Sequence, residues 1–63
     1  MTEYAKGLTV ECIERPGYLD GFRRGGRYVI VDVERHHGTR YLKILGDDDR
    51  AHVLLYSMFR VVH

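Results

Sequence analysis

The middle of the chain contains its most strand-like segment, Gly25-Gly26-Arg27-Tyr28-Val29-Ile30-Val31-Asp32-Val33. Five of the six residues from position 28 to position 33 are apolar, and most of these are β-branched, a type that favours β-strands. The two glycines indicate a turn immediately before the run. The sequence therefore predicts a strand at about residues 27–34, with which the shorter strands of the chain can pair.

The other strand-like segments lie on both sides of this run. Alternation of apolar and polar residues predicts a strand at about 8–14, and comparable patterns predict strands at about 39–45, 50–56 and 60–62. Turn residues separate these segments at 36–38 and 46–49, and one 3₁₀ turn is expected at 56–59. Five short strands predict an all-β domain, a small barrel or sandwich with a long loop between its first two strands.

The size and composition of the chain limit what it can do. Its 63 residues allow one domain with one small core, since a chain of this length buries only about 60% of its unfolded surface. We expect residues 1–7 to form a flexible tail and residues 8–63 to form the domain. A content of 44% hydrophobic and 30% charged residues is typical of a globular protein, and neither a secretory signal nor a membrane-spanning run is expected. These features predict a cytoplasmic location.

The order of the segments resembles the small SH3-like barrels of short bacteriophage and prophage proteins, most of which have no assigned role. The resemblance covers about residues 8–62 and rests on Val10-Glu11-Cys12-Ile13, Gly25-Gly26-Arg27-Tyr28-Val29-Ile30, Tyr41-Leu42-Lys43-Ile44-Leu45-Gly46-Asp47-Asp48-Asp49 and Ser57-Met58-Phe59. It implies a five-stranded SH3-like barrel and a phage-encoded accessory protein that binds and modulates a host protein or complex in the host cytoplasm.

The chain departs from related patterns in two ways. Such barrels usually place a glycine after the acidic turn, where this chain has Arg50. The chain also lacks tryptophan and the Ala-Leu-Tyr-Asp-Tyr segment of eukaryotic signalling SH3 domains, so recognition of polyproline peptides is not expected.

An arginine-rich loop is the most asymmetric charge feature of the sequence. Residues 15–27 carry four arginines and a single aspartate, and two aromatic residues lie among them. Such a composition suits an acidic protein surface, and it equally suits nucleic acid, because arginines contact phosphates and aromatic rings stack on bases. A solvated loop is the plain alternative, and the net charge of +1 does not by itself predict a nucleic-acid binder. The predicted partner-binding residues are Arg15, Tyr18, Phe22, Arg23, Arg24, Arg27, His36, His37 and Tyr41.

The central strand raises a second question about contact surfaces. If Tyr28 and Ile30 point into the core, strict alternation sends Val29, Val31 and Val33 to the opposite face. These valines are then either covered by the long loop or the N-terminal tail, or they form an apolar interface for a partner or for a homodimer.

Side chains capable of catalysis or metal binding do not form a convincing pattern. Cys12 alternates with the core residues of the first strand, and Ser57 suits a turn better than a nucleophile. A metal site could draw on His36, His37 and His52 with an aspartate from 47–49, yet adjacent residues of an extended segment point in opposite directions. The aspartates at 47–49 lack the spaced twelve-residue loop of an EF-hand. We therefore predict no catalytic residue, no cofactor and no metal, and a module that binds a protein or, alternatively, nucleic acid.

Overall fold

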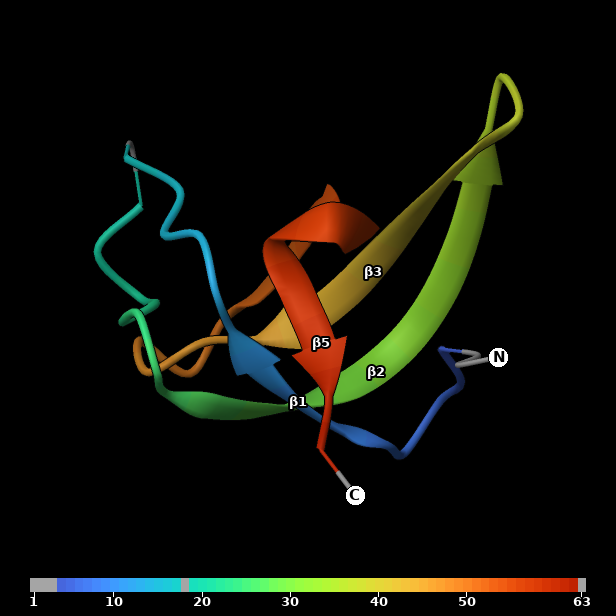
Figure 1. Ribbon diagram of the computed structural model, residues 1–63. Coiled ribbons are helices and arrows are strands. Elements are labelled where there is room, and N and C mark those ends of the chain that lie inside the picture. Colours follow the sequence, from blue (N-terminus) through green and yellow to red (C-terminus); the bar gives the residue numbers. More distant parts are fainter. Residues whose placement is uncertain (1–3, 18, 63) are drawn as a thin grey trace.

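The computed structural model describes residues 4–17 and 19–62 and has five strands (Figure 1). The elements are β1 (Thr9–Cys12), β2 (Arg27–His36), β3 (Thr39–Leu45), β4 (Ala51–Leu55), the 3₁₀ turn η1 (Tyr56–Met58) and β5 (Phe59–Val61). The predicted all-β class and the five predicted strands are confirmed. None of the helical segments in the described part of the chain is long and apolar enough to cross a membrane.

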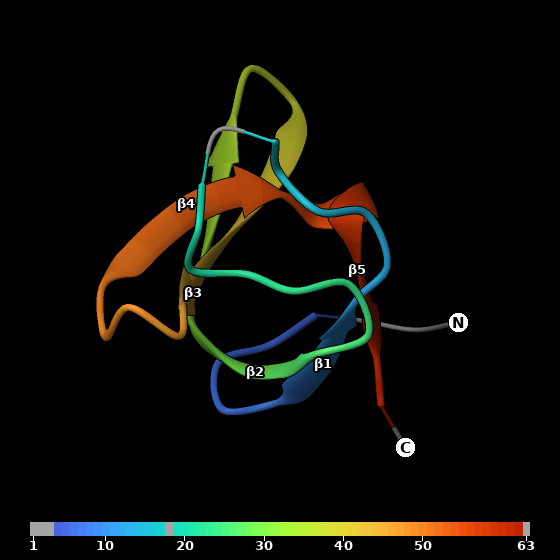
Figure 2. The ribbon, with the colours of Figure 1, turned by 90° about the vertical axis from the view of Figure 1, so that its left-hand side faces the viewer.

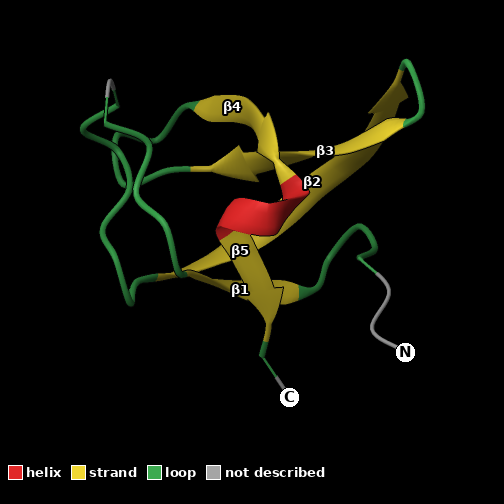
Figure 3. Ribbon diagram, turned by 45° about the horizontal axis from the view of Figure 1, so that its top comes forward, coloured by secondary structure: helices red, strands yellow, loops and turns green. Residues whose placement is uncertain are grey.

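The strands form one antiparallel sheet in the order β4-β3-β2-β1-β5 (Figure 3). Its two outermost strands, β4 and β5, are not paired with each other, so the sheet is open. The long strand β2 joins its two halves, because its first residues pair with β1 and its later residues pair with β3.

A bulge in β2 bends the sheet at the junction of these halves. Ile30 pairs with Ile44 and Asp32 with Lys43, so Val31 is an extra residue in the ladder. An extra residue of this kind bends a strand and changes which face the following side chains occupy. The bend lets the two halves of the sheet enclose a core between them.

Nine residues form that core, and they come from the loop before β2 as well as from all five strands. Alternate positions along β1, β2 and β3 are buried, as the period-two patterns predicted. Among the described residues, the hydrophobic cluster consists of Val10, Cys12, Phe22, Tyr28, Ile30, Leu42, Ile44, Leu54 and Phe59.

The β2–β3 hairpin projects from this body and ends in a two-residue turn (Figure 1). His36 pairs with Thr39, and the residues between them have positive φ values, 52° at His37 and 79° at Gly38. Two consecutive positive φ values are typical of a type I′ turn, whose twist matches that of the strands it joins. The turn predicted at 36–38 is therefore confirmed.

The segment before β1 packs on the body of the protein. The hydroxyl of Tyr4 donates a 2.8 Å hydrogen bond to the carbonyl of Phe59, and its ring lies edge-on to Tyr56 at 5.8 Å. The amide of Gly7 donates to the carbonyl of Ile30 at 2.8 Å, which extends the pairing beside β2. Residues 4–7, assigned to a tail from sequence, thus make contacts with the domain.

Candidate functional site

The long loop between β1 and β2 runs across one end of the sheet (Figure 2) and is anchored by Phe22. The side chain of Phe22 is fully buried, with its ring edge-on to Tyr28 at 5.0 Å, His52 at 5.5 Å and Phe59 at 5.9 Å. The prediction that Phe22 contacts a partner is wrong, because a ring with no exposed surface cannot stack on a base or touch another protein. Its role is to hold the loop on the core.

A buried tyrosine hydroxyl fastens the same loop to the acidic turn. The Tyr28 hydroxyl accepts a hydrogen bond from the amide of Arg23 at 2.7 Å and donates one to Asp47 at 2.9 Å. Burial is the main cause that raises the pKa of Tyr28 above its ordinary value, and Asp47 adds to the rise. The amide of Asp47 also donates to the carbonyl of Gly21 at 2.6 Å. The arginine loop is therefore held in place by β2 and by the 46–49 turn.

Two glycines allow this close approach. In the turn at 23–26, Gly25 has a φ of 85°, and the amide of Gly26 donates to the carbonyl of Arg23 at 2.9 Å, as in a type II turn. In the turn at 46–49 the positive φ, 62°, belongs to Asp49 and not to Gly46. Gly46 is required for space, since a Cβ there would lie 2.8 Å from the carbonyl oxygen of Gly21.

Acidic groups lie beside most of the predicted arginines. Arg15 lies 3.6 Å from Asp20, and the guanidinium of Arg23 lies 3.4 Å from Asp47. Arg27 lies opposite Glu11 in the ladder between β1 and β2. These carboxylates reduce the positive field of the loop, which weakens the argument for nucleic acid. Arg24 is exposed, and Tyr18 lies outside the described residues.

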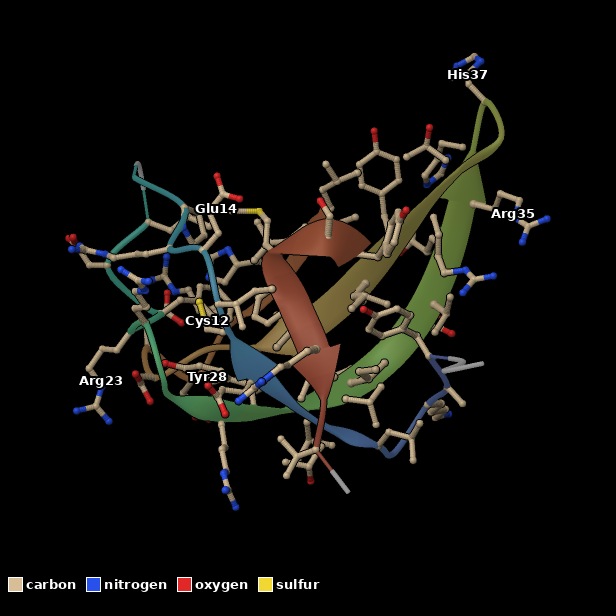
Figure 4. All side chains as sticks on the ribbon, viewed as in Figure 1. Cys12, Glu14, Arg23, Tyr28, Arg35 and His37 are labelled. Atoms are coloured by element: carbon tan, nitrogen blue, oxygen red, sulfur yellow. The ribbon has the colours of Figure 1, made fainter. Side chains whose placement is uncertain are left out.

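The two predicted histidines lie far from this loop. Figure 4 shows Arg23 at the end of the molecule that carries the long loop, and His37 at the tip of the hairpin at the opposite end. His36 is paired with Glu34 at 2.9 Å, and its ring lies 5.6 Å from that of the half-buried Tyr41. The loop arginines and the histidine turn therefore do not form one continuous contact surface, as a single binding face would require.

The three valines of β2 do not share one face. Val29 and Val31 are exposed, at 49% and 37%. Val33 packs against the core and lies opposite the buried Leu42, so the prediction that it shares a face with Val29 and Val31 is wrong. The physical reason is the bulge at Val31, which shifts the alternation so that Val33 follows Ile30 onto the inner side.

Val29 and Val31 belong to a larger apolar surface, most of which was not predicted from the sequence. On β3 and β4, residues next to buried core positions point to the outer side of the sheet, and three of them are large and apolar. Together with Val29 and Val31 they define what we term the outer face: Val29 (49% exposed), Val31 (37%), Leu45 (42%), Val53 (45%) and Leu55 (37%). The signal in the sequence was the run Val53-Leu54-Leu55, in which only the middle residue is needed by the core.

Polar groups on the same side of the sheet carry both signs of charge. Lys43 lies between Asp32 on β2 and Val53 on β4, and Tyr41 lies between Glu34 and Leu55. An apolar centre with mixed charges is typical of a protein contact surface. The two carboxylates would repel nucleic-acid phosphates.

Among the described residues, the side chains considered for catalysis or metal binding do not form one cluster. The thiol of Cys12 is buried, and burial raises its pKa. His52 lies 3.0 Å from Asp48, whose pKa is lowered mainly by that hydrogen bond. Within the described ranges, no group of three or more His, Cys, Asp or Glu side chains is placed to hold a metal ion.

No protein-family model, curated protein or solved structure matches the chain. Any statement about function therefore depends on the geometry of the surfaces described above. Of these, the outer face is the surface that the fold leaves apolar and uncovered in the described part of the chain.

Proposed function

We propose that this protein is a non-enzymatic protein–protein interaction module and that its contact surface is the outer face. The observation that carries the proposal is the set of five large apolar residues exposed on three adjacent strands. Soluble monomers rarely expose extended apolar patches, because keeping apolar surface in water costs roughly 25 cal/mol per Å². A partner that covered the outer face would recover this free energy.

The position of the other segments supports this choice. The long loop is anchored at one end of the sheet by Phe22 and Tyr28, and Tyr4 packs on Phe59 and Tyr56. Among the described residues, neither segment covers Val29 or Val31. Cover by the loop or the tail was the alternative to a contact surface, and these contacts count against it.

Strand order and resemblance support a more specific form of the proposal. Five strands with a bent β2 shared between two halves, and a 3₁₀ turn immediately before β5, suit an SH3-like barrel. The resemblance to small phage barrels points to an accessory protein that binds and modulates a host protein or complex in the cytoplasm. We favour a folded protein partner with an apolar patch over a homodimer or nucleic acid.

The test compares two charge-introducing double variants in pull-downs from lysate of the host cell. Val29→Glu/Val53→Glu alters the two most exposed positions of the outer face, and the control Arg23→Glu/Arg24→Glu alters the long loop. The new carboxylate at position 53 would lie opposite Lys43, so this variant should fold. We expect a partner that wild type and the loop variant retain and that the outer-face variant loses, with the loss reproduced by calorimetry using the purified partner.

Other outcomes would contradict the proposal in distinguishable ways. Loss of the partner only in the loop variant would assign binding to the arginines. Binding to DNA or RNA that falls steeply between 50 and 200 mM salt would support the nucleic-acid alternative. A sedimentation mass of twice 7.4 kDa for wild type, reduced to one chain in the outer-face variant, would assign the face to a homodimer.

A further inference from the structure

A hollow of about 510 Å³ lies against the β2–β3 hairpin, and of its lining only Leu55 also belongs to the outer face. The hairpin, η1 and the end of β4 supply its lining: Arg35, Gly38, Thr39, Arg40, Leu55, Tyr56 and Ser57. Figure 4 shows Arg35 on the projecting hairpin, at the opposite end from Arg23 and the long loop. The hollow is therefore separate from the arginine loop singled out in the sequence.

Two arginines face each other across the hairpin at this hollow. Arg35 and Arg40 are direct partners in the β2–β3 ladder, two positions beyond the pair of Val33 and Leu42. Side chains two positions apart on a strand point to the same side, so both arginines lie on the side of the sheet that carries the core. The outer face is on the other side of the same strands.

The pairing of these arginines is unfavourable in the absence of an anion. Like charges directly opposite each other in an antiparallel ladder are destabilising. None of the lining residues is acidic, and within residues 4–17 and 19–62 neither guanidinium forms an ion pair. By contrast, Arg15, Arg23 and Arg60 each have a carboxylate within 3.6 Å. An anionic ligand would remove the repulsion between the two charges.

The remaining lining groups indicate which anion fits. Tyr56 and Ser57 are hydroxyl-bearing residues of the lining, and hydroxyls donate hydrogen bonds to oxyanions. The ring of Tyr56 is oriented by its edge-on contact with Tyr4. A phosphate monoester carries about −1.5 to −2 charges at pH 7 and has three terminal oxygens. It would match two guanidiniums and the hydroxyls of η1, whereas a carboxylate would neutralise only one arginine.

We propose that the hollow between Arg35 and Arg40 is a binding site for a phosphate monoester, with the two guanidiniums holding the phosphate oxygens. The site does not depend on the proposed function, since the two arginines lie on the core side of the sheet and the outer face shares only Leu55 with the hollow. The phosphate could belong to a small phosphate ester or to a phosphorylated side chain, which share this chemistry.

The test is an NMR titration of the full chain with ¹H–¹⁵N spectra recorded at constant ionic strength. The probes are inorganic phosphate, O-phosphoserine, a phosphoserine peptide, dimethyl phosphate and acetate. The variants are Arg35→Gln and Arg40→Gln, and Arg24→Gln removes an exposed arginine of the long loop as the control. Relieved repulsion means that the two test variants should fold at least as well as wild type.

We expect saturable shifts confined to residues 35, 38–40 and 55–57 with phosphate and O-phosphoserine. Affinity should fall about tenfold or more in each test variant and stay unchanged in the control, since about 1.4 kcal/mol corresponds to tenfold. Tighter binding of the peptide than of O-phosphoserine would assign the site to phosphorylated proteins, and equal binding would assign it to small esters. Shifts that follow total charge, equal binding of acetate or of the diester, or unchanged affinity in both test variants would overturn the proposal.

Discussion

Replacing Tyr28 by phenylalanine tests whether its hydroxyl fastens the long loop to the acidic turn. The ring of phenylalanine keeps the 5.0 Å contact with Phe22, so the substitution removes the hydroxyl alone. The amide of Arg23 then loses its acceptor at 2.7 Å, and Asp47 loses its donor at 2.9 Å. Asp47 can bond water instead, because its side chain is 48% exposed. The cost is therefore mainly that of one unsatisfied backbone amide, about 1–2 kcal/mol.

A loss of this size is a large part of the stability of so small a domain. At about 0.05–0.15 kcal/mol per residue, the free energy of unfolding of the 63-residue chain is roughly 3–9 kcal/mol. The melting temperature should fall by about 4–16 °C, from roughly 4–8 °C per kcal/mol in a domain of this size. Urea unfolding followed by circular dichroism measures the change, with an unchanged m-value if both proteins unfold in two states.

Tyr41→Phe is the matched control for this substitution. Its hydroxyl forms no hydrogen bond with other described residues, so we expect its removal to change the free energy of unfolding by less than about 0.5 kcal/mol. If Tyr28→Phe also changed the free energy of unfolding by less than about 0.5 kcal/mol, the role assigned to the Tyr28 hydroxyl would be refuted. Equal losses in the two variants would show that any tyrosine hydroxyl has the same effect.

Two further predictions concern neighbouring residues of the loop and the acidic turn. Gly26→Ala should destabilise the protein by about 2–3 kcal/mol, because the new Cβ would lie 2.7 Å from the Tyr28 hydroxyl oxygen. At Gly25 there is space for a Cβ but φ is 85°, so Gly25→Ala should destabilise the protein by about 1–2 kcal/mol. Thermal melts in which Gly25→Ala is the less stable variant would contradict the steric argument. The hydrogen bond from His52 lowers the pKa of Asp48 below its ordinary value of 3.8, so its stabilisation is present above that pH and is lost as the pH falls through the lowered pKa. The His52→Phe variant keeps an aromatic ring beside Phe22. Its urea midpoint should therefore fall less steeply than that of wild type between pH 5 and pH 2. Identical pH profiles of the two proteins would exclude the hydrogen bond between His52 and Asp48 as a source of acid sensitivity.

The strands of this protein could be predicted from its sequence, because each depends on local patterns. The β-branched run at 28–33 and the alternation around Val10 follow from the pleat of a strand, in which successive side chains point to opposite faces. The turns could also be predicted from local sequence. Gly25 and Gly38 both have a positive φ, a backbone conformation that glycine adopts readily.

The candidate sites depended on contacts that local patterns do not encode. Phe22 looked like a loop aromatic available to a ligand, yet it is a core residue, because the loop folds back over the end of the sheet. A pairing irregularity of a single residue at Val31 separated Val33 from the other two valines. The strands that complete the outer face, and the register that sets Arg35 opposite Arg40, follow from long-range pairing.

Sequence alone thus determined the class of this protein, the number and places of its strands and the positions of its turns, since these depend on the preferences of residues a few positions apart. The tertiary structure alone decided which side chains face water together. It brought the acidic turn to the arginine loop, separated that loop from the histidine turn and gathered five apolar residues on one face. The physical reason is that strand register and bulges are fixed by the packing of the whole core.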